Sequence, residues 1–399
     1  IMSHALNITG GSEDIAYSIG ASYFDQKGII GGDVTDAGLK RLTLRMNTEF
    51  VLFKNERHSI ITLGENLTYT NTENRQVATG NIYWNDLHNA LVQNPLMPAF
   101  WDKSPDQHGY TPTLDGLAND QTNPLAVMFY RHNYNWGKNN TVVGNVYLEV
   151  EPIERLKLRS SFGIDSWFGH NRSWTPTYAL GVLYSNATDG AQQGQYFGNN
   201  WTWTNTASYD FSIGDHNVSA VVGYELYKNQ INTDVGGNMA GTRFGLPEYA
   251  YLNNVDKTDI NSINTWGADW AAGGGGLMSY IGRAQYNYKE KFLVSATVRA
   301  DGSSNFAKGN RWGTFPSLSA GWVITNEDFM DSTSDIINFG KLRASWGQNG
   351  NQSIDNFIYS SSIAYINPGY FFGDTKPVSG ATAIPARVTN PDVTWETSE

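Results

Sequence analysis

The sequence predicts an all-β protein, an antiparallel up-and-down β-barrel that crosses a membrane. Three observations predict it. Many segments alternate apolar and polar residues, and the links between these segments alternate between short and long. The composition is rich in glycine and in aromatic residues, which make up 13% of the chain, whereas charged residues make up only 16%. Outer-membrane barrels have tight turns on one side of the membrane and extended loops on the other, which is the pattern of links seen here.

The stretch 291–301 shows the alternation most clearly. Its apolar side chains fall on one side of a period-two pattern, at Phe292, Val294, Ala296 and Val298. Its polar side chains fall on the other side, at Ser295, Thr297 and Arg299. The chain therefore forms a strand there with one apolar face and one wet face.

Read in the same way, the whole chain contains twelve expected strands. They lie near 5–11, 14–24, 40–50, 58–70, 140–151, 155–168, 201–212, 216–228, 277–288, 291–301, 314–325 and 339–347. Long loops, expected to be extracellular, lie near 71–139, 170–200 and 229–276, whereas the link 327–338 is neither tight nor long and interrupts the rhythm. Because long unstructured loops are uncommon in compact domains, their regular recurrence favours a barrel over a soluble sandwich.

The apolar stripes should face lipid and the polar stripes should line a wet lumen. Clear apolar stripes include Leu156, Leu158, Phe162 and Ile164, and aromatic residues near strand ends suit the two membrane interfaces: Trp167, Phe168, Trp203 and Phe211. A soluble sandwich would bury the same stripes, so the stripes alone do not separate the two folds. The alternation of the links does.

Composition excludes several classes of function. The chain has no cysteine, so zinc–thiolate sites and cysteine nucleophiles are absent, and a net charge of −11 with no basic cluster argues against nucleic acid. The histidines are scattered without metal-ligand spacing, and the acidic, glycine-containing segments do not match a calcium loop. We therefore expect no cofactor, no metal and no catalytic residues.

Polar positions facing the lumen and aromatic residues of the long loops are the candidate ligand contacts. Exposed aromatic rings beside carboxylates can stack on sugars or hold peptides. The candidate substrate-binding residues are Trp84, Asp86, Trp101, Trp266, Asp269 and Trp270, within a wider set that also includes Asp102, Tyr110, Trp136, Tyr249 and Tyr251. The alternative for each ring is that it packs the loops together or against a partner.

Several blocks also resemble a known family, in one order along the chain. They are Asn7–Ile30, Leu39–Asn47, Tyr286–Phe306, Arg311–Trp322, Lys341–Gln352 and Asn390–Thr397. The block Tyr286–Phe306 contains the run SATVRADGSSNF, and the block after it reads RWGTFPSLSAGW. These blocks are similar to the SusC/RagA group of TonB-dependent outer-membrane transporters.

The resemblance implies an importer in the outer membrane of a Gram-negative bacterium. A SusD-like surface lipoprotein would cap the mouth and pass on an oligosaccharide or peptide, and the TonB complex would act on a plug encoded before this stretch. A dimer of transporter–lipoprotein pairs is expected in the surrounding membrane lipid. We expect the chain to be an internal piece of one barrel, without the plug. The alternatives are a passive porin and, less in keeping with the resemblance, a soluble β-rich glycan-binding protein.

Overall fold

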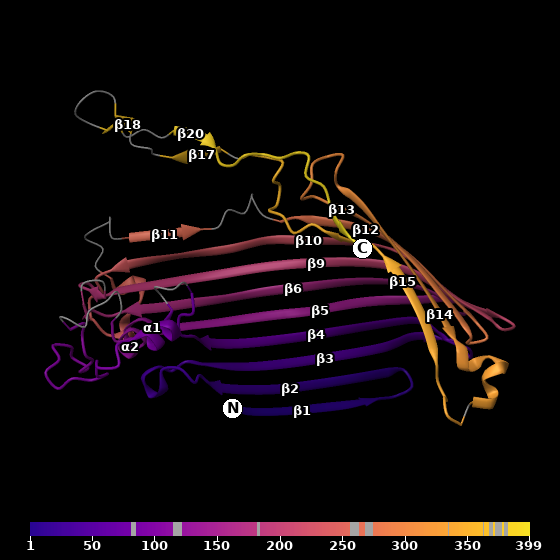
Figure 1. The fold of residues 1–399 in the computed structure, drawn as a ribbon, viewed down its shortest axis with the longest axis horizontal. Helices are drawn as coiled ribbons and strands as arrows, with labels where there is room; N and C mark the ends of the chain where they lie inside the picture. The colour runs from indigo at the N-terminus through magenta and orange to yellow at the C-terminus, as the bar shows by residue number, and fades with distance from the viewer. Residues whose placement is uncertain are drawn as a thin grey trace.

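One antiparallel sheet dominates the computed structural model (Figure 1). The structure describes residues 1–80, 85–114, 122–181, 184–255, 263–267, 274–333, 335–361, 363–366, 370–371, 377–378 and 382–399. Within these residues the sheet has 13 strands in the order β1-β2-β3-β4-β5-β6-β9-β10-β12-β13-β14-β15, with β11 paired to β10 off this path. Strands that follow one another along this path are neighbours in sequence order, which is the up-and-down connectivity that the sequence predicts.

The strands of the sheet lie side by side across the molecule, and each is antiparallel to its neighbours. They are β1 (Met2–Gly11), β2 (Ile15–Lys27), β3 (Gly38–Lys54), β4 (Ser59–Arg75), β5 (Asn135–Ile153), β6 (Leu156–Thr175), β9 (Gly190–Ile213), β10 (His216–Ala240), β11 (Ile263–Gly267), β12 (Gly276–Tyr288), β13 (Phe292–Ser303), β14 (Trp312–Val323) and β15 (Lys341–Gly347). All twelve expected strands are present on the main path. Three of them are much longer than expected.

The extra length lies at the end of the sheet where the long links are, called here the long-loop end. β6 continues from the expected end at 168 to Thr175, β9 begins at Gly190 rather than 201, and β10 continues from 228 to Ala240. These extensions are rich in glycine, glutamine and asparagine, and so they carry no apolar stripe. The hydrogen-bonded pairing of the strands continues beyond the apolar part of the sheet. There the side chains no longer alternate between apolar and polar, so the sequence does not predict a strand.

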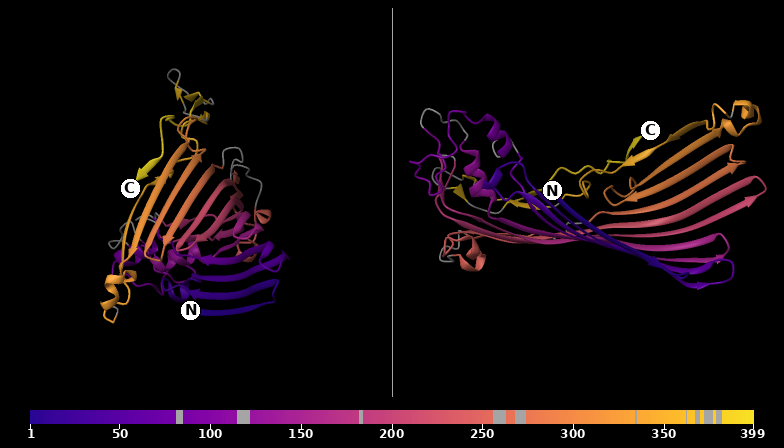
Figure 2. Two further views of the ribbon diagram at one scale, coloured as in Figure 1. Left: turned by 90° about the vertical axis from the view of Figure 1, so that its right-hand side faces the viewer. Right: turned by 90° about the horizontal axis from the view of Figure 1, so that it is seen from below.

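The sheet is strongly curved, as a trough seen from its side (Figure 2). The register fixes which side chains share a face: Glu49 pairs with Gly64, Gly64 with Tyr147 and Tyr147 with Ser161, so these residues all point to one side. This is the polar face, and three hollows of the main sheet are lined mostly by its residues. The polar face is therefore the concave one and the apolar face is the convex one.

The convex face carries the predicted apolar stripes with aromatic residues toward both ends. At the short-turn end, the rings of Phe292 and Trp322 stack with centroids 6.4 Å apart. Farther along the strands, Phe168 pairs directly with Phe197. Trp167 was expected beside Phe168 in this aromatic band, and that expectation is wrong because neighbouring residues of a strand point to opposite faces.

The short-turn end closes the hairpins tightly. Between β12 and β13, Lys289 and Glu290 adopt φ of 53° and 57°, the left-handed region that non-glycine residues enter at a cost. The next link, which contains η5 (Ile324–Asn326) and η6 (Asp328–Thr333), folds back against this turn.

Contacts of Lys291 and Glu327 hold that link in place. The Lys291 Nζ lies 3.1 Å from Glu327 Oε2 and 3.2 Å from Asp328 Oδ1, and the Trp322 indole donates to Glu327 Oε1 at 3.0 Å. The indole hydrogen bond, and then the Lys291 ammonium, lower the pKa of Glu327 below its ordinary value of 4.5.

The long-loop end holds the remaining elements. They are α1 (Asp86–Val92), α2 (Pro124–His132), η1 (Gly32–Val34), η2 (Pro247–Tyr249), η3 (Leu252–Asn254) and the ribbon of β7 (Tyr178–Ala179) with β8 (Ser185–Asn186). Buried residues of the described chain gather here, in one cluster around Tyr130 and Leu180 and another around Trp174 and Met239. The described buried clusters thus lie among the loops and the strand extensions at this end of the sheet.

The C-terminal part forms three further two-stranded ribbons. They pair β16 (Asn349–Asn351) with β21 (Glu396–Ser398), β17 (Ile363–Ile366) with β20 (Thr382–Pro385), and β18 (Tyr370–Phe371) with β19 (Pro377–Val378). Among the described residues, no helix has the length and apolarity needed to cross a membrane.

Candidate functional site at the polar face and the long-loop end

Charged side chains on the concave face are organised into paired networks. In the first network, Glu149 Oε1 lies 3.0 Å from the Lys157 ammonium, and its other oxygen lies 3.7 Å from Arg159 Nη1. The Arg159 guanidinium lies over the ring of Tyr147, 3.6 Å from its centroid. Tyr147 in turn donates its hydroxyl to Glu49 Oε2 at 2.6 Å. Three strands, β3, β5 and β6, are therefore linked by one chain of polar contacts that passes across β4.

This network depends on the absence of a side chain at Gly64. Gly64 lies between Glu49 and Tyr147 in the register, and the Tyr147 ring crosses it to reach the carboxylate. A Cβ at position 64 would lie 2.2 Å from Tyr147 Cζ, which is far inside normal contact distance. The glycine is thus required by close approach of the ring.

A second network lies across β9, β10, β12 and β13. Arg299 Nε donates to Asp301 Oδ1 at 2.8 Å, and Arg299 Nη2 donates to Ser279 Oγ at 2.8 Å and to Glu225 Oε1 at 3.3 Å. The Thr204 hydroxyl donates to the second oxygen of Glu225 at 3.0 Å. Each of these side chains points to the polar face, so the network fixes the wall of the concave side.

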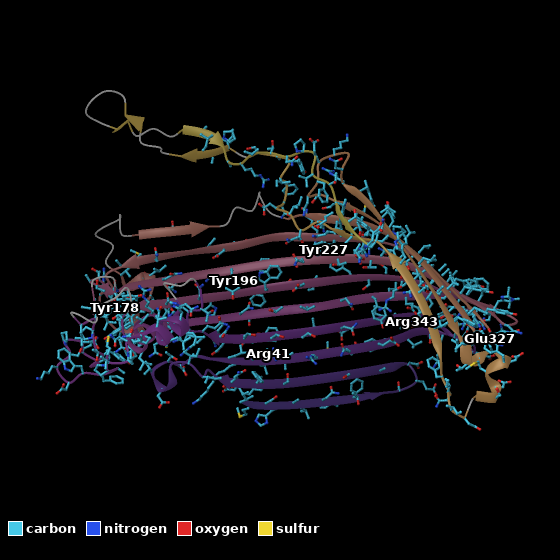
Figure 3. All side chains as sticks on the ribbon, viewed as in Figure 1. Arg41, Tyr178, Tyr196, Tyr227, Glu327 and Arg343 are labelled. Carbon is cyan, nitrogen blue, oxygen red and sulfur yellow. The ribbon has the colours of Figure 1, made fainter. Side chains whose placement is uncertain are left out.

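The sequence alone did not identify these networks as units. The alternation placed Glu149 and Arg159 on the wet face, but nothing in the spacing showed that Tyr147 reaches across two strands to Glu49. The feature of the sequence that could have indicated this contact is Gly64, because a strand glycine opposite a tyrosine lets the ring lie flat across the neighbouring strand. The polar face also carries Arg41, Tyr196, Tyr227 and Arg343, which are spread over the sheet from β3 to β15 (Figure 3).

Two of the candidate loop residues can be placed in the structure, and they differ. Asp86 is 2% exposed: its Oδ2 accepts from the Ala78 backbone N–H at 2.7 Å and lies 3.0 Å from His132 Nε2. This carboxylate joins α1 to α2. Trp101 is 36% exposed, and its backbone N–H donates to the Gly109 carbonyl at 2.9 Å. Only Trp101 presents its side chain to solvent.

The other four candidates cannot be placed as contacts. Trp84, Asp269 and Trp270 lie outside the described residues, and so does the side chain of Trp266, whose backbone belongs to β11. From the wider set, Tyr110 is buried at 4% exposure in the loop core, where its ring stacks on Phe100.

Two other aromatic residues of the wider set meet around an arginine. The Arg172 guanidinium lies 4.2 Å from the ring centroid of Trp136 and 4.3 Å from that of Tyr251. Trp136 lies near the start of β5, after the long link that follows β4, and Tyr251 lies in the long link that follows β10, so the structure joins segments that are far apart in sequence. In the part of the chain that the structure describes, no group of three or more acidic or histidine side chains could hold a metal ion.

Known proteins similar to this chain are transport receptors. No protein-family model matches it. TonB-dependent receptor P26 of Formosa agariphila is 28% identical over 397 residues, which cover 98% of this chain and 36% of that protein. TonB-dependent receptor SusC of Bacteroides thetaiotaomicron is 28% identical over 413 residues, covering 98% of this chain and 38% of that protein. The chain resembles the SusC-type TonB-dependent receptors.

The SusC-type resemblance holds for the fold as well. The structure of the RagAB peptide transporter matches 99% of this chain and 41% of that one, with a TM-score of 0.73 and 21% identity. The RagAB peptide importer in its open-open state matches with a TM-score of 0.72. The sheet is therefore part of a transmembrane antiparallel up-and-down β-barrel, as the sequence predicted. The chain spans well under half the length of these SusC-type relatives.

Proposed function

We propose that the chain forms part of the barrel wall of an outer-membrane importer for an oligosaccharide or a peptide. The observation that carries the proposal is the division of the sheet into two faces across twelve consecutive strands. A convex apolar face with aromatic residues toward both ends suits lipid, and a concave face with paired charges suits a wet passage. Similarity to SusC-type receptors supports the same function.

The residues of the wall have a passive part in this proposal. Paired charges such as Glu149 with Lys157 and Arg299 with Asp301 hold their side chains in fixed positions, so the passage keeps its shape as a solute moves. The wall performs no bond chemistry. Energy for import comes from the TonB complex acting on a plug in another part of the protein.

The long-loop end is the proposed extracellular mouth, in loops near 71–139, 170–200 and 229–276. A SusD-like lipoprotein caps it, and the transporter–lipoprotein pair forms a dimer in the outer membrane. Trp101 is the one described candidate whose ring is available to a solute or to the lipoprotein, and it stands with Trp84, Trp266, Asp269 and Trp270 as proposed contacts. Asp86 is withdrawn from the proposed contacts because it is buried between two helices.

Extraction of the native complex in mild detergent, followed by mass spectrometry, tests the partnership. We expect a lipoprotein to co-purify with the full-length transporter. Uptake of fluorescent neutral oligosaccharides and fluorescent oligopeptides into cells tests import itself, with and without a protonophore. Uptake of one class that stops when the proton gradient collapses supports the proposal. Uptake that continues unchanged, by a protein that purifies alone, contradicts it and favours the passive porin.

A further inference from the structure

A pocket on the convex face lies just beyond the lipid-facing aromatic pair. Above Phe168 and Phe197, the next outward-facing pair on β6 and β9 is His170 with Gln195, and the one after it is Arg172 with Gln193. Arg172 is four residues beyond Phe168. A rise of about 3.3 Å per residue and a strand tilt of about 40° place it roughly 10 Å above the aromatic pair. The headgroup layer of a bilayer leaflet is about 5–8 Å thick, so the backbone of Arg172 lies just beyond that layer.

The charge of Arg172 is held in place without a carboxylate. Its guanidinium is enclosed between the rings of Trp136 and Tyr251, at 4.2 Å and 4.3 Å from their centroids. The Arg172 Nη1 is shielded from solvent and, among the described residues, has no hydrogen-bond partner. Stacking on two ring faces leaves the donors at the edge of the guanidinium free. An oxyanion would satisfy them with two parallel hydrogen bonds.

The surroundings form a built pocket. A hollow of about 620 Å³ lies between the sheet and η3, and its lining includes Trp136, His170, Arg172, Gln193, Gln195 and Tyr251. The Leu252 backbone N–H donates to Gln193 Oε1 at 2.8 Å, which fastens η3 over the strands. The neighbouring Lys138 is paired with Glu73 at 2.8 Å and is therefore not counted as a free cation.

We propose that this pocket binds the phosphate headgroup of an anionic lipid in the outer leaflet. The inference uses the membrane placement of the barrel and does not depend on import. The acyl chains lie against the apolar face below Phe168 and Phe197, and the phosphate reaches Arg172 from the lipid side, because the register of β5, β6 and β9 points the Arg172 side chain to the convex face. Two glutamines and a histidine add donors around the phosphate oxygens.

Native mass spectrometry of the full-length transporter in neutral detergent tests the proposal, with diphosphoryl lipid A as the probe. We expect Arg172→Gln to weaken retention of the lipid about tenfold, the effect of losing a charge-assisted hydrogen-bond pair. Arg172→Lys keeps the positive charge but lacks the paired donors of the guanidinium, and it should retain an amount of lipid between those of the wild type and Arg172→Gln. Arg75→Gln is the matched control, because Arg75 lies at the same end of the sheet and is already paired with Asp36 at 2.5 Å. It should retain lipid as the wild type does.

Two further arms separate the sources of phosphate. Dephosphorylated lipid A should be retained about tenfold less than diphosphoryl lipid A by the wild type, and inorganic phosphate at millimolar concentration should leave the lipid bound. Full displacement by inorganic phosphate assigns the pocket to free phosphate and overturns the headgroup. Equal retention by Arg172→Gln and wild type also overturns it. If Arg172→Gln does not fold, equal retention of the two lipids by the wild type is the overturning result. Loss of uptake in cells has no bearing on any of these outcomes.

Discussion

Substitution of Gly64 by alanine gives the sharpest test of the polar-face network. The new Cβ would lie 2.2 Å from Tyr147 Cζ and 2.4 Å from its Oη, whereas carbon atoms in contact lie about 3.5–4.0 Å apart. The ring must therefore move by more than about 1 Å. That movement breaks the 2.6 Å hydrogen bond from Tyr147 to Glu49 and the 3.6 Å contact of Arg159 with the ring.

The expected cost follows from those two contacts. A hydrogen bond to a charged group contributes about 1.5–3 kcal/mol and a cation–π contact about 0.5–1 kcal/mol. Because the Glu49 side chain is exposed, its share is reduced by solvent, and we expect a loss of about 1–3 kcal/mol in the free energy of unfolding. Urea unfolding of the full-length protein in lipid bilayers measures it.

Two companion variants make the measurement decisive. Gly163→Ala lies on the same face of β6, where a Cβ would meet its nearest atom at an ordinary 3.6 Å, and we expect almost no change. In a Tyr147→Ala background, Gly64→Ala should cost much less than in the wild type, because the obstructing ring is gone. Equal effects of Gly64→Ala and Gly163→Ala, or simple additivity with Tyr147→Ala, would refute the reasoning.

Three other predictions follow from single contacts. Asp86→Ala leaves the Ala78 backbone N–H without its carboxylate acceptor and should destabilise the segment around α1 by about 1–3 kcal/mol, seen as rapid proteolysis near that helix with an intact barrel, while the exposed Asp102→Ala should have no effect. Because Glu327 has a lowered pKa, its stabilisation of the 324–340 link is complete above its ordinary value of 4.5 and is lost as the pH falls through the lower folded value; hydrogen exchange in the link should quicken in that range, and Glu327→Gln should remove the dependence. Glu290→Gly relieves a left-handed residue and should stabilise the barrel by about 1 kcal/mol in the same urea assay; a loss of stability would contradict the strain.

The sequence predicted the sheet better than it predicted the site, for a physical reason. Strand order and facing depend on a local alternation, so residues such as Val294 and Ser295 report their own environment. The extensions of β6, β9 and β10 contain only isolated apolar residues such as Phe197, and without a continuous alternation the sequence does not predict their length.

Site contacts depend on register between strands, which alternation does not fix. Asp86 is a candidate because it stands in an aromatic loop, yet its carboxylate is buried and lies 3.0 Å from the partly buried His132 of another helix. Trp136 and Tyr251 lie more than a hundred residues apart, and Arg172, which joins them, lies in an extension without a stripe. The chemistry of these side chains was visible in the sequence, whereas their partners required the fold.

Single-cysteine scanning along β6 tests the central claim, that one face of the sheet meets lipid and the other lines a wet passage. The 399 residues contain no cysteine, so each introduced thiol reports alone within them. We would place cysteines at every position from 158 to 165 and expose the full-length protein in native membranes to a charged, water-soluble maleimide. Positions 159, 161, 163 and 165 should react, and positions 158, 160, 162 and 164 should be protected. Reaction that does not alternate, with both sets labelled alike, would contradict the account.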